Sequence, residues 1–201
     1  MSATAEERRQ QLVELFEEVK RCEKCPLHET RTKPVFGAGN ADADLMFVGE
    51  APGAEEDRQG LPFVGRAGQL LNQMLEEIGL ARDDVFIANV LKSRPPGNRD
   101  PLPLEIQACE PYLLEQVRLI EPRVVCTLGN FATKLLSGSH PAAALRTPAV
   151  KETLRADFAT IPDLLQRPLP GPIPSSEELK EAEEEGGSTP PPPSDQLGFF
   201  G

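Results

Sequence analysis

Short apolar runs alternate with longer stretches of mixed polarity along the first two thirds of the chain. Three runs are too short for helices and predict buried strands, at 43–49, 84–91 and 123–128. Helical spacing of apolar side chains predicts four helices, at 5–21, 68–80, 102–120 and 129–138. Asp100 is the expected N-cap of the third of these helices, with Pro101 behind it, and Gly79 is expected to end the second.

Strands that alternate with helices predict a three-layer α/β/α sandwich with a central parallel sheet. In such sheets ligands gather at the carboxyl ends of the strands. The segment VGEAPGAEEDRQGLPFVGRAG (48–68) follows the first strand, and Asn89 lies near the end of the second. Two further segments rich in Gly and Pro, 22–40 and 92–101, are expected to be loops. We therefore expect the binding site where segment 48–68 and Asn89 meet.

The alternating pattern stops near Arg167. Residues 167–201, rich in Pro, Ser and Glu, predict a disordered tail behind a single domain at 1–166. Residues 171–201 hold seven acidic side chains and one basic side chain, which leaves about −5 of the formal charge of −11 on the rest of the chain. A mildly acidic domain can still carry a local basic face, so the charge does not exclude a nucleic-acid partner.

The cysteines bring in the first candidate chemistry. The N-terminal segment is charged and has no apolar core of a signal peptide, so we expect a cytoplasmic protein, without a membrane segment, whose thiols stay reduced. Cys22 and Cys25 form a C-x-x-C pair in a loop, while Cys109 falls on a helix and Cys126 ends a strand. Four thiols of this kind suit zinc or an iron–sulfur cluster, and buried structural thiols are the third alternative.

Six blocks of sequence, in order, resemble the family 4 uracil-DNA glycosylases, the iron–sulfur type of the uracil-DNA glycosylase superfamily. They are CEKCPLHETRTKPVFGAGN, LMFVGEAPGAEEDRQGLPFVGRAGQLLNQML, IANVLKSRPPGNRDP, ACEPYL, VVCTLGNFATKLLSG and HPAAAL. The resemblance runs from about residue 10 to 165. It implies a monomeric, nucleoid-associated hydrolase that breaks the N-glycosidic bond of uracil in single- or double-stranded DNA and starts base excision repair. It also implies a structural 4Fe–4S cluster on Cys22, Cys25, Cys109 and Cys126.

The resemblance assigns roles in uracil binding. Phe63 is the platform for the flipped base, and such stacking is worth roughly 1–3 kcal/mol. Asn89 reads O4 and N3–H of uracil through its side-chain amide, and Gly49 lets the backbone approach the base. His140 donates to uracil O2 as negative charge builds on the leaving base. Without the resemblance, a core phenylalanine, a loop-capping asparagine and a loop histidine explain the same residues.

Further residues are candidates for the water and the DNA backbone. Glu50 would hold the attacking water and stabilise positive charge on the sugar, with Asp57 as a helper. Arg66, Arg94 and Arg99 are candidates for DNA phosphates. The alternative for each arginine is a solvated surface charge.

The chain departs from the family before His140. Only Ser139 separates LLSG from the HPAAAL block, and no apolar run precedes the histidine, so the fourth core strand of the family would be missing. A donor misplaced by 1 Å costs about a hundredfold in rate. The alternative function is therefore a catalytically impaired cluster protein that binds uracil or DNA. A zinc-stabilised structural protein is a third hypothesis.

The tail ends in QLGFF, which resembles the short motif by which bacterial repair proteins dock on the sliding clamp. Gln196 would bond to the rim of the pocket, and Leu197, Phe199 and Phe200 would fill it. A proline-rich linker would give the motif reach and raise the local concentration of the enzyme near DNA. A stray apolar terminus is the alternative.

Overall fold

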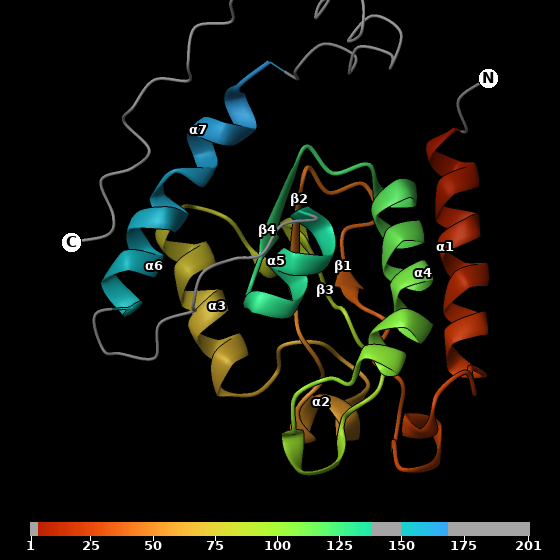
Figure 1. The fold of residues 1–201 in the computed structure, drawn as a ribbon. Coiled ribbons are helices and arrows are strands. Elements are labelled where there is room, and N and C mark those ends of the chain that lie inside the picture. Colours follow the sequence, from red (N-terminus) through yellow and green to blue (C-terminus); the bar gives the residue numbers. More distant parts are fainter. Residues whose placement is uncertain (1–3, 138–149, 169–201) are drawn as a thin grey trace, which may run out of the picture. The chain divides into compact units, whose positions relative to one another are not determined.

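The computed structural model of the 201-residue chain describes residues 4–137 and 150–168 (Figure 1). By its internal contacts the chain divides into two units, Met1–Arg167 and Pro168–Gly201. The described part of the first unit holds a four-stranded sheet in the order β1-β3-β2-β4. Its strands are β1 (Ala38–Gly39), β2 (Leu45–Gly49), β3 (Phe86–Asn89) and β4 (Val124–Thr127).

The three predicted strands are β2, β3 and β4, and they are parallel, as predicted. The sheet as a whole is mixed, because β1 pairs antiparallel with β3 at one edge. The sequence indicated a loop there, since a two-residue strand has no periodicity that could reveal it. Among the four described strands, β1 is thus a short edge strand that does not belong to the parallel set.

Helices cover both faces of the sheet. The α-helices are α1 (Ala5–Lys20), α2 (Ala54–Gln59), α3 (Arg66–Glu77), α4 (Pro103–Ile120), α5 (Asn130–Ser137), α6 (Val150–Ala159) and α7 (Ile161–Gln166). Short 3-10 turns add η1 (Pro26–Glu29), η2 (Arg82–Asp84) and η3 (Pro96–Asn98). Figure 1 shows α1 and α4 on one side of the sheet and α3, α6 and α7 on the other, which confirms the three-layer α/β/α architecture.

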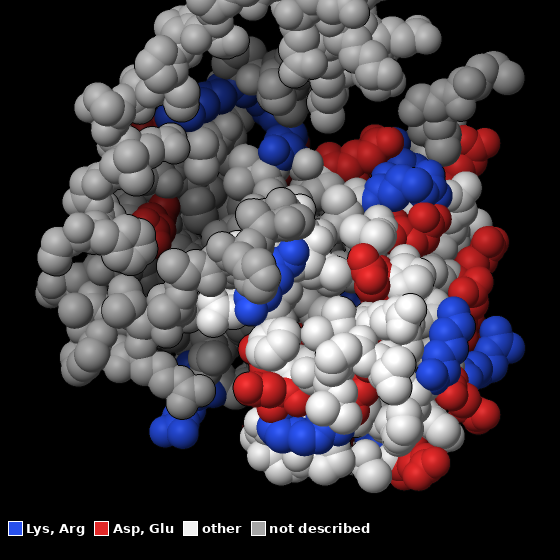
Figure 2. Space-filling view, in the orientation of Figure 1, with Lys and Arg blue, Asp and Glu red and all other residues white. Residues whose placement is uncertain are grey.

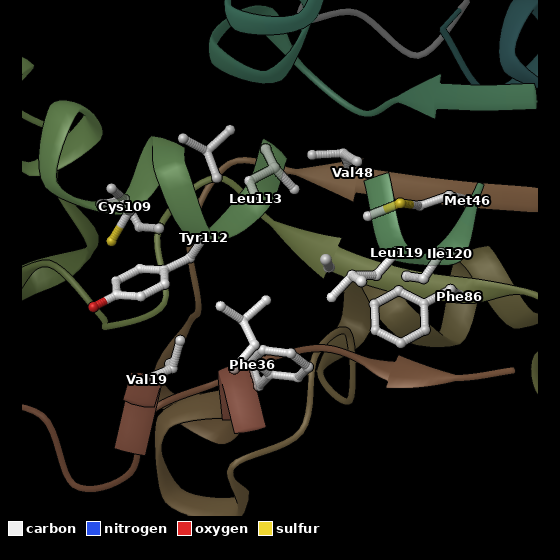
Figure 3. Packing of buried hydrophobic residues seen from close by; sticks show 14 of the residues in the cluster. Val19, Phe36, Met46, Val48, Phe86, Cys109, Tyr112, Leu113, Leu119 and Ile120 are labelled. Carbon is white, nitrogen blue, oxygen red and sulfur yellow. The ribbon is translucent and has the colours of Figure 1, made fainter. Parts of the chain in front are cut away.

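Each face of the sheet has its own apolar core. All five residues of β2 are buried, and alternation sends Met46 and Val48 to the α1/α4 side and Leu45 and Phe47 to the α3/α6 side. The first core is drawn in Figure 3, where Met46 and Val48 lie near Leu113, Leu119 and Ile120 of α4. In the second, the Phe47 ring stacks on Phe158 of α6 with centroids 5.4 Å apart.

Two helix predictions need correction. The N-cap of α4 is Leu102, and Asp100 does not cap it. The Glu105 carboxylate, at the third helical position, accepts a hydrogen bond from the Leu102 N–H at 2.8 Å, so the helix start is held by a side chain inside the helix. The six-residue α2 lies inside segment 48–68, where Gly and Pro had indicated a plain loop.

The outer strand β4 is less covered than its neighbour. Its residues are partly exposed, with Val125 at 36%, whereas every residue of β2 is buried. Within 4–137 and 150–168, β4 pairs with β2 alone. None of the helices in these two ranges is long and apolar enough to cross a membrane.

Candidate active site

A pocket of about 260 Å³ opens where β2 and β3 end. Gly49 and Asn89, the last residues of these strands, are partners in the parallel register. The pocket is lined by Ala51, Gly53, Glu56, Phe63, Gly65, Arg66, Ala67 and Asn89. The structure thus brings Phe63 and Asn89 together at the sheet edge where the sequence predicted a site.

Asn89 presents an unsatisfied acceptor in this pocket. The residue is 2% exposed, and among the described residues its Oδ1 has no hydrogen-bond partner. A buried polar atom without a partner costs about 1–3 kcal/mol, so its retention points to a ligand that supplies the donor. The neighbouring glycine makes room for it, because a Cβ on Gly49 would lie 2.4 Å from Asn89 Oδ1 and 2.5 Å from Phe63 Cζ.

Glu56 holds the loop that carries Phe63. Its Oε1 accepts hydrogen bonds from the backbone N–H groups of Val64 and Gly65, each at 2.9 Å, and its Oε2 accepts one from Gly53 at 3.1 Å. Phe63 itself has a φ of +50°, a left-handed conformation that costs a non-glycine residue about 1–2 kcal/mol. The carboxylate offsets this strain, and a charge inside the loop is the only sign of it in the sequence.

Arg82 forms hydrogen bonds to the same loop from its other side. Its guanidinium donates to the carbonyl of Phe63 at 3.0 Å, to that of Pro62, and to Asn72 Oδ1 at 3.2 Å. Gly68 lets the first turn of α3 approach, since a Cβ there would lie 1.8 Å from the Phe63 carbonyl oxygen. The Phe63 backbone is therefore bonded on both sides, which fixes the ring that lines the pocket.

Lys92 supports the strand end below Asn89. It is 2% exposed, and its Nζ donates to the Asn89 carbonyl at 2.8 Å and to Gln116 Oε1 at 2.6 Å. Gln116 in turn donates to the Phe36 carbonyl at 2.9 Å. Burial lowers the pKa of Lys92 to about 7, and the Cys109 thiol opposes that shift. Sequence reasoning missed this network, because a lysine is rarely buried.

Glu50 follows Gly49 directly and is half-buried. Burial raises the pKa of its carboxyl group, and the negative charge of Asp100 adds to the rise. Its backbone carbonyl accepts from the Leu91 N–H at 3.0 Å, which ties it to the segment after β3. Asp57, the predicted helper, is buried elsewhere and accepts from the Thr32 N–H at 2.9 Å, so its position is explained by the loop it anchors.

The three candidate arginines differ in what they contact. Arg66 begins α3 and lines the pocket. Arg94 donates to Asn98 Oδ1 at 2.7 Å. Arg99 forms a two-point ion pair with the buried Glu105, at 2.9 and 2.6 Å. Arg66 is thus the arginine that the geometry places at the pocket, and His140 lies outside the described residues.

Three of the four cysteines share one neighbourhood. Cys109 is buried in the core on the α1/α4 side, and Cys22 and Cys25 pack against that core (Figure 3 shows Cys109). Burial raises the pKa of Cys109, and the thiols of Cys25 and Cys22 add to the rise, so the three groups act on one another. Burial raises the pKa of Tyr112, one helical turn after Cys109, and the nearby Cys22 thiol adds to the rise.

The structure does not bring Cys126 to this group. Cys126 is the register partner of Phe47 and packs against the core on the α3/α6 side, across the sheet from the other three thiols. Alternate residues of a strand point to opposite faces, and this alternation sends the Cys126 side chain away from α4. Burial raises its pKa to about 11, with Asp157 adding to the effect. The predicted set of four is therefore three thiols together and one apart.

Within the described residues, no three His, Cys, Asp or Glu side chains stand close enough to hold one metal ion. This criterion concerns a single ion. Thiols around a four-iron cube stand further apart than thiols that share one ion, because the inorganic core lies between them. Thiolates are the donors that iron–sulfur clusters take, so the chemistry of these three side chains suits such a group.

Comparisons with known proteins place the chain among DNA glycosylases. The family model "Uracil DNA glycosylase superfamily" matches residues 36–161. A "Type-4 uracil-DNA glycosylase" of Archaeoglobus fulgidus is 41% identical, with 79% of this chain and 96% of the relative covered. Proteins of the same name from Sulfurisphaera tokodaii (43% identical; 78% and 86% covered) and Thermotoga maritima (53%; 62% and 65%) are also similar.

The extents of these alignments show a gap. The Archaeoglobus alignment extends over 190 residues but takes in 79% of the 201 residues here, about 159. About 30 positions of that alignment therefore have no counterpart in this chain. The Thermotoga alignment of 125 residues takes in 62% of the chain, about 125 residues, and has no such gap. These extents do not give the place of the gap in the chain, so the shortening before His140 stays a prediction.

Proposed function

The chain belongs to the uracil-DNA glycosylase superfamily and to its type-4 family, and from this premise we propose that it removes uracil from DNA in base excision repair. The reaction is hydrolysis of the N-glycosidic bond between uracil and deoxyribose, without strand cleavage. The observation that carries the proposal is the buried Asn89 Oδ1, which has no partner within the described residues and lies in the wall of a pocket that Phe63 also lines.

Recognition follows from these two side chains. Uracil has an N–H at N3 and a carbonyl at O4, so the Asn89 amide can accept from the first and donate to the second. Cytosine offers a bare N3 and an amino group, which leaves both contacts mismatched and a buried acceptor unpaired. Phe63 supplies the stacking face. Its backbone is held in place before the base arrives, so binding costs little further conformational entropy.

Bond cleavage needs help at the sugar and at the leaving base. Glu50, beside the pocket at the end of β2, holds the attacking water and stabilises positive charge at C1′. Its raised pKa is consistent with a carboxyl group shielded from bulk water. His140 donates to uracil O2, and Arg66 contacts the phosphate next to the flipped nucleotide. These roles rest on position in the sequence and, for Arg66, on its place in the pocket wall.

The test is excision from a single-stranded uracil oligonucleotide by the full chain, read as alkali-induced cleavage. Asn89→Ala removes the amide and is expected to lower the rate at least a hundredfold, which exceeds the worth of one ordinary hydrogen bond. Gln69→Ala removes an exposed amide from α3 and is the matched control, with an unchanged rate. Equal rates for the wild type and Asn89→Ala would reject the assignment of Asn89.

A second candidate function is favoured by the gap of about 30 positions in the alignments. In this alternative the chain binds uracil-containing DNA without excising the base, because the shortened segment leaves His140 out of place. The same oligonucleotide separates the two functions. Retained affinity without cleavage, in a protein that folds, would support the binding function.

We propose that the cofactor is an iron–sulfur cluster held on the α1/α4 side by Cys22, Cys25 and Cys109. Such a cluster would act as a structural cross-link, because hydrolysis of the glycosidic bond involves no electron transfer to or from the protein. The three thiols come from the loop after α1 and from α4, so holding one group fastens that loop to the domain. Measuring the zinc content of the purified chain tests the alternative that zinc, and not a cluster, occupies the site.

We propose that the monomeric enzyme acts at the nucleoid and is recruited to the bacterial sliding clamp through Gln196, Leu197, Phe199 and Phe200. These residues lie outside the described part of the chain, so the proposal rests on the sequence match. The full chain is expected to bind the purified clamp, and the double variant Phe199→Ala, Phe200→Ala is expected to lose that binding while keeping its excision rate. Equal binding by the double variant would reject the motif.

A further inference from the structure

We propose that Ser93 occupies the fourth corner of the cluster site, so that the cluster is bound by three thiolates and one serine oxygen, and that Cys126 takes no part. This inference rests on the proposed iron–sulfur cofactor and concerns which side chains of this chain bind it. The position of Cys126 leaves the corner open. Cys126 packs on the α3/α6 face of the sheet, and the other three thiols belong to the core on the opposite face.

Ser93 is buried and directly follows the residue that contacts the Cys109 thiol. It is 3% exposed and follows Lys92, whose backbone N–H donates to Cys109 Sγ at 3.5 Å. The segment that carries Ser93 therefore runs directly past the Cys109 thiol. The Ser93 hydroxyl oxygen accepts one hydrogen bond, from Arg31, and has a second lone pair that can bind another group.

Arg31 links Ser93 to the end of α1, just before Cys22. Its Nη1 donates to Ser93 Oγ at 3.3 Å, and its Nη2 donates to the Lys20 carbonyl at 3.2 Å, two residues before Cys22. Ser93 Oγ and the segment that leads to Cys22 thus contact one positive charge.

This charge gives the serine the chemistry of a ligand. A serine hydroxyl binds iron as an alkoxide, and a hydrogen bond from a guanidinium stabilises the negatively charged form of its acceptor. Oxygen is a harder ligand than sulfur, whereas iron–sulfur clusters favour thiolates. The iron atom at the Ser93 corner should therefore be the most easily lost, and a thiol at this position should retain it better.

The experiment measures the cluster directly. The full chain and its variants are purified without oxygen and reconstituted with ferrous iron and sulfide. Three quantities are then measured: the iron content per chain, the visible absorbance at about 400 nm, and the electron paramagnetic resonance signal after mild oxidation. The variants are Cys126→Ala, Ser93→Ala and Ser93→Cys, with Cys109→Ala as the control that removes a thiolate. Circular dichroism during thermal unfolding shows whether each variant folds.

We expect Cys126→Ala to keep the iron content of the wild type, and Cys109→Ala to lose most of it. Ser93→Ala should lose about a quarter of the iron and give the signal of a three-iron cluster, because a four-iron cube loses the iron at its weakest corner. Ser93→Cys should bleach more slowly in air than the wild type.

Loss of iron from a folded Cys126→Ala would overturn the proposal. So would Ser93→Ala and Ser93→Cys proteins that match the wild type in iron content and bleaching rate. If the wild type itself takes up no iron and sulfide, the cofactor proposal fails and this inference fails with it. The excision assay of Asn89→Ala does not depend on that outcome, so the two failures can be told apart.

Discussion

At the scale of single residues, the pocket depends on how closely two side chains approach one backbone position. Asn89 Oδ1 and the Phe63 ring both lie where a side chain on Gly49 would start. Any side chain at position 49 must displace the group that reads the base or the ring that stacks on it. The absence of a Cβ at Gly49 is therefore part of the site, and this makes a direct prediction.

Gly49→Ala is expected to lower the single-turnover excision rate about a hundredfold, the cost of moving a positioned group by 1 Å. The new methyl group would meet Asn89 Oδ1 at 2.4 Å and Phe63 Cζ at 2.5 Å. Ala54→Ser is the matched control in the same loop, because Ala54 is exposed at the start of α2 and is not among the residues that line the pocket. Comparable losses in the two variants would contradict this account of Gly49.

The charge next to Glu50 makes a second prediction at this scale. A base that holds water must be ionised, and burial together with Asp100 raises the pKa of Glu50. Asp100→Asn removes the repulsion, lowers that pKa and should move the acidic limb of the kcat/KM profile to lower pH. Asp163→Asn, an exposed carboxylate on α7, should leave the profile in place. An unmoved limb in Asp100→Asn would show that Glu50 does not control it.

At the scale of elements, the loop after β3 is fastened to the start of α4 by one carboxylate. Glu105 is 2% exposed and accepts from the Leu102 N–H and from both ends of the Arg99 guanidinium. It therefore joins the cap of α4 to the loop that carries Arg94 and Arg99. The hydrogen bonds to Arg99 are the main reason that the pKa of Glu105 is lowered.

Glu105→Gln is expected to lower the free energy of unfolding at pH 7 by about 1–3 kcal/mol, because the remaining groups lose a charged partner. The folded-state pKa of Glu105 lies below its unfolded value, so its contribution is present above about pH 4.5 and fades as the pH falls through the folded pKa. Urea unfolding at pH 7 and at pH 3 should show the wild-type advantage shrinking in acid. Glu115→Gln breaks an exposed pair with Arg118 on the same helix and should cost about 0–1 kcal/mol.

At the scale of the whole molecule, the chain carries a formal charge of −11, and the proposed function requires it to bind a polyanion. Figure 2 shows one face, on which described Lys and Arg side chains alternate with Asp and Glu and form no continuous basic surface. Binding on this pattern would rest on a few local phosphate contacts near the pocket. Few contacts release few counterions, so the salt dependence of binding should be shallow.

Arg66→Ala is expected to reduce the slope of log affinity against log salt for single-stranded DNA by about 0.7, the value of one phosphate contact. Fluorescence anisotropy with a labelled oligonucleotide at several salt concentrations measures the slope. Arg58→Ala is the control, because Arg58 is exposed on α2 and paired with Glu55. A slope that is the same in Arg66→Ala as in the wild type would remove Arg66 from the DNA interface.

The sequence by itself determined the parallel strands, the main helices and the edge of the sheet where Asn89 and Phe63 meet. These features depend on local periodicity and on strand direction, which a single chain displays directly. The sequence also indicated that the segment before His140 is shortened, because no apolar run precedes the histidine.

Only the tertiary structure decided which groups hold the site together. Glu56, Arg82 and Lys92 act through backbone groups that no spacing in the sequence connects to them. The cysteines make the same point. The spacing favoured a set of four, but alternation along β4 turned Cys126 to the other face of the sheet, where Phe158 and its neighbours bury it. Spacing along a chain records which groups are available, and the two faces of a folded sheet decide which of them can meet.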